Sequence, residues 1–115
     1  MTTGQRGEQR AAEFLERHGY VVLARNYRTR YGDIDLICAG AGCIVFVEVK
    51  TRSSTKFGAP REAVTLSKQR KIILAAQQWL AEHPTELQPR FDVVEVLVSG
   101  GLCRVNHISN AFEVS

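Results

Sequence analysis

The sequence lacks the features of disulfide-rich, zinc-stabilised and membrane proteins. Its three cysteines, Cys38, Cys43 and Cys103, form no CxxC pair, which argues against a disulfide framework and a structural zinc site. Small core positions are the expected role of these thiols. The N-terminus lacks the apolar core of a signal peptide, and no apolar run is long enough to cross a bilayer. We therefore expect a cytoplasmic protein without membrane association.

The chain does have enough apolar sequence for one hydrophobic core. Apolar residues make up 44% of its 115 residues, and no internal repeat, low-complexity stretch or long linker divides it. Residues 1–115 are therefore expected to form a single domain. The 15 Lys and Arg outnumber the 12 Asp and Glu, and this mild excess of positive charge is compatible with a polyanionic partner.

The hydrophobic pattern predicts two helices and five strands. A short turn at residues 40–42 predicts an antiparallel hairpin, and the second helix predicts a parallel crossover between the strands on either side of it. The fold class is therefore α/β, a three-layer αβββαβ core whose central mixed sheet is flanked by helices, with one further edge strand. The helices are expected at Gln5–His18 and at Arg61–Glu82, with a break near Thr65–Ser67, and the strands at Tyr20–Asn26, Asp33–Ala39, Cys43–Thr51, Phe91–Val98 and Leu102–Ile108.

The predicted hairpin brings acidic side chains together. Asp33 and Asp35 share one side of the first strand, and Glu48 and Lys50 share one side of the second. A two-residue loop within residues 40–42 pairs residues whose numbers add to an odd sum. Both sets of side chains are then expected on the same face of the sheet.

In this register Asp35 opposes either Phe46 or Glu48, at a Cβ separation of about 4.5 to 5.5 Å for directly opposed residues. Two carboxylates so close repel each other unless a cation lies between them, and carboxylate oxygens suit Mg²⁺ or Mn²⁺. A bound metal ion with Lys50 beside it would be equipped for phosphodiester hydrolysis. The same three charged residues are also compatible with a structural ion-pair cluster at a sheet edge.

Two inward polar residues on the helices favour a site over a purely structural cluster. Glu8 shares a helix face with Ala11, Ala12 and Leu15, and Gln69 precedes the inner stripe of the second helix. Such groups need polar partners when buried. Each is also compatible with a satisfied polar group at a helix end.

Basic residues surround the predicted acidic patch, and Arg and Lys at such positions bind a nucleic-acid backbone without regard to sequence. Nearby tyrosines would stack on unpaired bases. A solvated surface is the alternative for each residue taken singly. The candidate nucleic-acid contacts are Arg28, Arg30, Arg52, Lys56 and Lys68.

Two motifs connect these residues with known proteins. The run Gly32–Ile37, followed by Val45–Arg52, resembles the signature of PD-(D/E)XK nucleases. With Gly7-Glu8 ahead and Arg90–Val93 behind, nearly the whole chain resembles the YraN-like family of small bacterial proteins, which is similar to archaeal Holliday junction resolvases and to the restriction-endonuclease-like fold.

The resemblance implies a role for each residue of the predicted site. Asp35 and Glu48 would be the metal ligands, Lys50 the catalytic lysine, and Glu8 the carboxylate from helix one that completes resolvase sites. Position 33 is usually Glu in the family, so Asp33 departs from the pattern and is expected to support the site.

We therefore expect a Mg²⁺- or Mn²⁺-dependent, structure-selective DNA endonuclease. Branched DNA is the expected substrate, and a homodimer would match the two-fold symmetry of a four-way junction. The alternatives are a nucleic-acid-binding protein that acts through a partner rather than by cutting, and a structural interaction protein.

Overall fold

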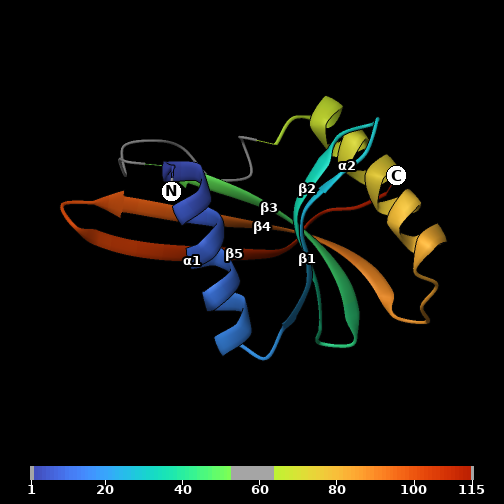
Figure 1. Ribbon diagram of the computed structural model, residues 1–115, viewed down its shortest axis with the longest axis horizontal. Helices are drawn as coiled ribbons and strands as arrows, with labels where there is room; N and C mark the ends of the chain where they lie inside the picture. Colours follow the sequence, from blue (N-terminus) through green and yellow to red (C-terminus); the bar gives the residue numbers. More distant parts are fainter. Residues whose placement is uncertain (1, 53–63, 115) are drawn as a thin grey trace.

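A computed structural model of the protein describes residues 2–52 and 64–114 (Figure 1). The predicted order of elements is confirmed, and residues 61–63 of the predicted second helix lie outside the described ranges. Along the chain the elements are α1 (Thr3–Arg17), β1 (Val21–Arg28), β2 (Asp33–Gly40), β3 (Cys43–Arg52), α2 (Leu66–Glu82), β4 (Gln88–Ser99) and β5 (Leu102–Phe112).

The five strands form one mixed sheet in the order β1-β2-β3-β4-β5. β3 and β4 pair in parallel, and the other three neighbouring pairs are antiparallel. The parallel pair confirms the predicted crossover, because α2 connects β3 to β4 and lies against the sheet. β3 is the central strand, and its run Ile44–Glu48 is buried throughout.

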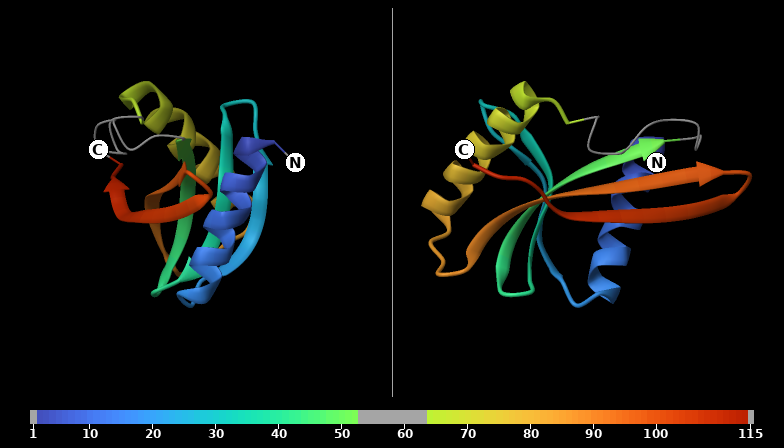
Figure 2. Two further views of the ribbon diagram at one scale, coloured as in Figure 1. Left: turned by 90° about the vertical axis from the view of Figure 1, so that its left-hand side faces the viewer. Right: turned by 180° about the vertical axis from the view of Figure 1, so that it is seen from behind.

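The helices cover opposite faces of the sheet, so the predicted three-layer α/β arrangement is confirmed (Figure 2). The core under α1 contains Leu15 and Val47, and the core under α2 contains Phe46 and Trp79. Alternate residues of β3 therefore enter different cores, as the two-residue period of a strand requires. No helix in the described parts of the chain is long and apolar enough to cross a membrane.

Each helix begins after a threonine whose side chain caps its first turn. Thr2 and Gln5 form a capping box at the start of α1, and Thr65 accepts a hydrogen bond from the Lys68 N–H at the start of α2. The break predicted near Thr65 is thus the point where α2 begins. In α1, Gly7 packs so tightly on β3 that a Cβ at this position would lie 1.8 Å from Thr51 Oγ1.

A buried carboxylate on β4 connects that strand to β5. Asp92 of β4 accepts hydrogen bonds from Arg90, from the backbone N–H of Asn110 and from His107 Nε2, the last at 2.7 Å. Burial alone would raise the pKa of Asp92, but these hydrogen bonds lower it below its ordinary value. No role was predicted for His107, which is a structural residue in this network.

The cysteines are all free. Cys38 is buried as predicted and Cys43 is half-buried, whereas the prediction of a core position is wrong for Cys103, which is exposed. Cys103 lies next to the tight turn between β4 and β5, where the hairpin extends beyond the helices (Figure 1).

Candidate functional site

The register of the β2–β3 hairpin is the one that the short turn predicted. Pairing runs from Gly40↔Cys43 to Leu36↔Val47, so the paired numbers have an odd sum. The loop consists of Ala41 and Gly42, both with positive φ, as in the primed turns that match strand twist. Continuing the register by one step places Asp35 opposite Glu48 rather than Phe46.

The strict alternation of side chains in β2 is interrupted at Asp35. Ile34 packs in the core under α2, whereas Leu36 packs in the core under α1, although they are two residues apart. Asn26, between the partners of Leu36 and Ile34 on β1, has a φ of 51°, a backbone geometry that bends a strand. The prediction that Asp33 and Asp35 share one face of the strand therefore fails at this bend.

The bend aims the Asp35 carboxylate at the backbone of β3. Asp35 Oδ2 accepts a hydrogen bond of 2.7 Å from the Val49 N–H, just beyond the last strand pair, Leu36↔Val47. The carboxylate thus satisfies a backbone donor of β3 at the point where β2 separates from it. Asp35 is thereby held beside Glu48.

Glu48 is a buried carboxylate, 5% exposed, with two lysines at one of its oxygens. Glu48 Oε1 lies 2.6 Å from Lys68 Nζ and 3.6 Å from Lys50 Nζ. Lys50 comes from the same strand, and Lys68 comes from the first turn of α2. The site therefore joins β2, β3 and α2.

The two carboxylates alter each other's electrostatic surroundings. Burial and then the repulsion of Glu48 raise the pKa of Asp35 from 3.8 to about 7, although the Val49 N–H partly offsets the rise. Repulsion from Glu8 adds to it. Burial and the neighbouring Lys68 lower the pKa of Lys50, and burial also acts to lower the pKa of Lys68, but its bond with Glu48 raises it overall.

The donor chemistry of Asp35 and Glu48 fits a divalent cation. Two adjacent carboxylates that repel each other suit Mg²⁺ or Mn²⁺, and Mg²⁺ is commonly bound through one or two carboxylates with water completing its shell. Within residues 2–52 and 64–114 no three His, Cys, Asp or Glu side chains gather closely enough to hold a metal ion. A metal ion here would therefore have two carboxylates and water as ligands.

The other predicted acidic and amide site residues, Glu8, Asp33 and Gln69, have different surroundings from Asp35 and Glu48. Glu8 is half-buried beside a pocket formed by α1 and β1, near enough for its charge to act on Asp35. Asp33 is exposed at the first position of β2. The Gln69 amide donates to the Val64 carbonyl at 3.1 Å, which corresponds to the alternative of a satisfied polar group at a helix end.

The predicted nucleic-acid contacts separate into three groups. Arg28 and Arg30 are exposed at the turn between β1 and β2, where Arg30 stacks on Tyr31 at 4.9 Å. Arg52 ends β3 and forms an ion pair with Glu95. Lys68, predicted as a nucleic-acid contact, forms an ion pair with Glu48 of the acidic site, and Lys56 is outside the described residues.

Glu95 was missed by the sequence analysis. It is 5% exposed on β4 and is the strand partner of Lys50, so the two side chains leave the sheet on the same face. Its Oε2 lies 3.0 Å from Arg52 Nε, but the geometry of that contact is not that of a hydrogen bond. A glutamate within the apolar run of β4 was the available signal, because a buried carboxylate requires a counter-charge.

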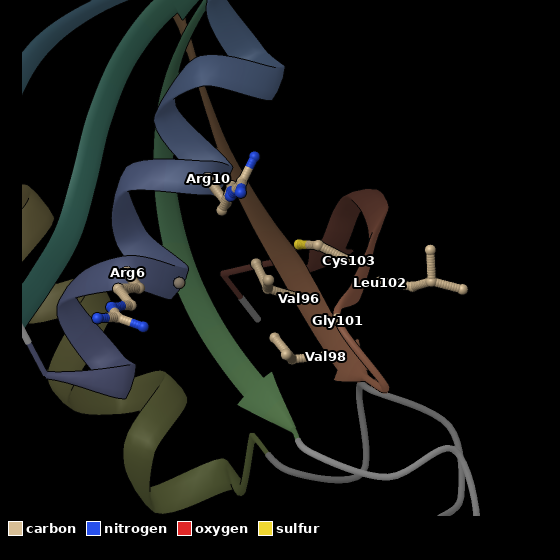
Figure 3. Close-up of a pocket in the computed structure, with 8 residues that line it drawn as sticks. Arg6, Arg10, Val96, Val98, Gly101, Leu102 and Cys103 are labelled. Carbon is tan, nitrogen blue, oxygen red and sulfur yellow. The ribbon is translucent and has the colours of Figure 1, made fainter.

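A pocket of about 220 Å³ lies elsewhere, between α1 and the β4–β5 hairpin (Figure 3). Arg6 and Arg10 line one side of it, and Val96, Val98 and Cys103 line the other. None of the acidic residues of the candidate site borders this pocket. The acidic site is thus defined by its charged side chains rather than by this cavity.

Comparison with known proteins identifies the family. The model of the uncharacterised protein family UPF0102 matches residues 7–96. The chain belongs to this family. UPF0102 corresponds to the YraN-like family that the sequence motifs resemble, so that prediction is confirmed.

Relatives in UPF0102 match over nearly their full length. A UPF0102 protein of Geobacter metallireducens is 47% identical over 97% of this chain and 93% of its own. One from Syntrophomonas wolfei is 50% identical over 92% and 93%, and one from Symbiobacterium thermophilum is 51% identical over 95% and 94%. Because the family is uncharacterised, membership in it assigns no activity to the chain. The function therefore has to be inferred from the chemistry of the site.

Proposed function

We propose that this UPF0102 protein is a Mg²⁺- or Mn²⁺-dependent endonuclease that hydrolyses phosphodiester bonds of structured DNA. The observation that carries the proposal is the meeting of Asp35 and Glu48 at the end of the β2–β3 pairing, with Lys50 beside Glu48. Two repelling carboxylates and an adjacent ammonium form an arrangement that binds a divalent cation and an anionic substrate together. The α/β architecture, with helices on both faces of a mixed sheet, is compatible with the restriction-endonuclease-like fold.

Each residue has a part in this chemistry that follows from its surroundings. Asp35 and Glu48 would hold the metal ion, which when bound supplies an activated water and neutralises charge on the phosphate. The Val49 N–H keeps the Asp35 carboxylate in position. Lys50, whose side chain is 24% exposed, would place its ammonium against the phosphate and stabilise the negative charge that builds there. Glu8, on α1, would add negative charge near Asp35.

The surrounding basic residues support DNA as the substrate. Arg28 and Arg30 stand at the turn that leads into β2, and Tyr31 beside Arg30 is half-exposed. Arginines bind phosphates without regard to sequence, and a tyrosine ring stacks on an unpaired base. Both features suit branched DNA, and a homodimer would supply two such sites to a four-way junction.

The proposal is tested by cleavage of labelled branched, flap and duplex DNA with Mg²⁺, Mn²⁺ or EDTA. We expect metal-dependent cutting by the wild type and a loss of about 100-fold or more for Glu48→Gln and Lys50→Met, as for other groups that stabilise developing charge. Glu13→Gln, at an exposed position of α1, is the matched control and should cut normally. A wild type that cuts nothing with either metal, or a Glu48→Gln variant as active as wild type, would refute the proposal.

A second candidate function is nucleic-acid binding without cleavage. The observation that favours it is the Glu48–Lys68 ion pair, which neutralises the buried carboxylate without a metal ion. This function predicts DNA or RNA binding that weakens steeply with salt and is unchanged by EDTA or by Lys50→Met. Fluorescence anisotropy at two or more salt concentrations measures this binding. Metal-stimulated cleavage of the same nucleic acid would exclude this second function.

A further inference from the structure

One oxygen of Glu48 faces two ammonium groups, and their distances from it differ. Lys68 Nζ is at hydrogen-bond distance, 2.6 Å, whereas Lys50 Nζ is 3.6 Å away. The Lys68 side chain is 41% exposed and comes from the first turn of α2, whereas the Lys50 side chain is 24% exposed on β3. Lys68 is thus the closer partner of Glu48 and also the one with more access to solvent.

Glu48 requires a cation in direct contact. An ionised carboxylate buried at 5% exposure is destabilising unless it is paired, and the charge of Asp35 nearby increases the need. In the structure Lys68 provides this contact. A divalent ion at the same oxygen would be held close to the Lys68 ammonium, and the two positive charges would repel each other.

We propose that Lys68 occupies the cation position on Glu48 in the metal-free protein, and that a divalent ion displaces its ammonium into the path of the substrate phosphate. This inference rests on the proposed function, because it takes Asp35 and Glu48 as the metal ligands. It assigns Lys68 two alternating partners, a carboxylate without metal and a phosphate with metal.

The position of Lys68 allows this exchange. A lysine has a flexible four-carbon stem and a point charge that can pair with either a carboxylate or a phosphate. The half-exposed side chain can withdraw from Glu48 toward solvent without moving α2, because the helix start is fixed by Thr65, which accepts from the Lys68 backbone N–H rather than from its side chain. Lys50 has less freedom, because it belongs to a central strand.

The exchange has consequences for metal affinity, stability and DNA binding. Removing the Lys68 ammonium leaves Glu48 open to the metal ion, so metal affinity should rise. The metal-free variant should be less stable than wild type because Glu48 loses its partner. Saturating metal should restore that stability, since the ion replaces the missing charge.

The test is calorimetric titration of Mn²⁺ into wild type, Lys68→Met and the control Lys71→Met, an exposed lysine on the same helix. We expect Lys68→Met to bind Mn²⁺ about ten-fold more tightly than wild type, within the roughly 5- to 150-fold range of coupled binding sites, and Lys71→Met to match wild type. Lys68→Arg keeps the charge and should also match wild type, which would assign the gain of the Met variant to the lost positive charge.

Two further readouts complete the experiment. Thermal melting with EDTA should give a lower Tm for Lys68→Met than for wild type, and Mn²⁺ should raise the Tm of the variant by the larger amount. In Mn²⁺, DNA binding by Lys68→Met should show a slope of log affinity against log salt reduced by about 1, the signature of one lost phosphate contact.

The outcomes separate this inference from the proposed function. If wild type binds Mn²⁺ and Lys68→Met binds it no more tightly, the exchange is refuted while the metal site stands. If neither wild type nor Lys68→Met binds Mn²⁺, the metal site of the proposed function is refuted, and the exchange with it. Tighter Mn²⁺ binding by Lys68→Met, with Lys71→Met and Lys68→Arg unchanged from wild type, supports both the exchange and the metal site.

Discussion

Asp35→Asn removes a negative charge that destabilises the folded state above neutral pH. In metal-free buffer at such pH the variant should therefore be more stable than wild type. The substitution is close to isosteric, and the asparagine carbonyl can still accept the hydrogen bond that Asp35 receives from the Val49 N–H. The change therefore isolates the charge. The neighbouring carboxylate of Glu48 and the burial of the site are the sources of the effect.

The magnitude follows from the pKa of Asp35, which is about 7 in the folded protein against 3.8 when unperturbed. A difference of about three pKa units corresponds to roughly 4 kcal/mol at 1.36 kcal/mol per unit, and we expect about 2 to 4 kcal/mol. The folded state keeps the proton between pH 3.8 and 7 whereas the unfolded chain loses it. Wild-type stability therefore falls across this window, and the full deficit is present above it.

The assay is thermal or urea unfolding in EDTA at pH 4 and pH 8.5, with wild type and Asp35→Asn compared at each pH. At pH 8.5 the variant should melt higher by roughly 3 to 6 °C for each kcal/mol gained, and at pH 4 the two proteins should nearly coincide. Asp33→Asn, an exposed acid on the same strand, should show no such difference. A gain that is absent at pH 8.5, or as large at pH 4, would refute the reasoning.

Three further predictions concern the close-packed Gly7 and the two buried carboxylates Asp92 and Glu95. Gly7→Ala places a Cβ against the β3 side chain below it and should cost about 1 to 3 kcal/mol in urea unfolding, whereas Gly4→Ala in the exposed first turn should be neutral or gain up to about 1 kcal/mol. Asp92→Ala should cost about 3 to 5 kcal/mol, because the arginine and histidine paired with it lose their partner. Since the pKa of Asp92 is lowered, its contribution should be complete above about pH 4 and fade as pH falls further, a pH profile that the variant should lack. Arg52→Ala removes the ion-pair partner of the buried Glu95 carboxylate. A double-mutant cycle with Glu95→Ala should show a coupling energy of about 0.5 to 3 kcal/mol between the two side chains, and simple additivity of the two effects would contradict the ion pair.

Local sequence was sufficient to predict the hairpin at the centre of the site. A turn of two residues allows few registers, and the two-residue period of strands then assigns faces. The predicted register placed Asp35 near Glu48, and the structure agrees. The bend at Asp35 was not predicted, because it depends on β1, which pairs with β2 across a separate turn and has Asn26 in a left-handed conformation.

The partners of the acidic residues were less accessible to sequence reasoning. The Lys68–Glu48 ion pair was not predicted, and Glu95 was not singled out at all. Helical periodicity tells which residues share a face of α2, but not how far along β3 the helix starts. A lysine stem also spans several ångströms, so small changes in helix position decide which carboxylate it reaches.

The sequence by itself determined the order of elements, the hairpin register and the family, because each depends on local periodicity, turn chemistry or direct similarity. The tertiary structure alone decided which charged and polar side chains meet: Lys68 with Glu48, Arg52 with Glu95, and His107 with Asp92. Those pairs join segments that are distant along the chain. Electrostatic partnership depends on separations of a few ångströms, and only the packing of helices and strands against one another sets distances on that scale.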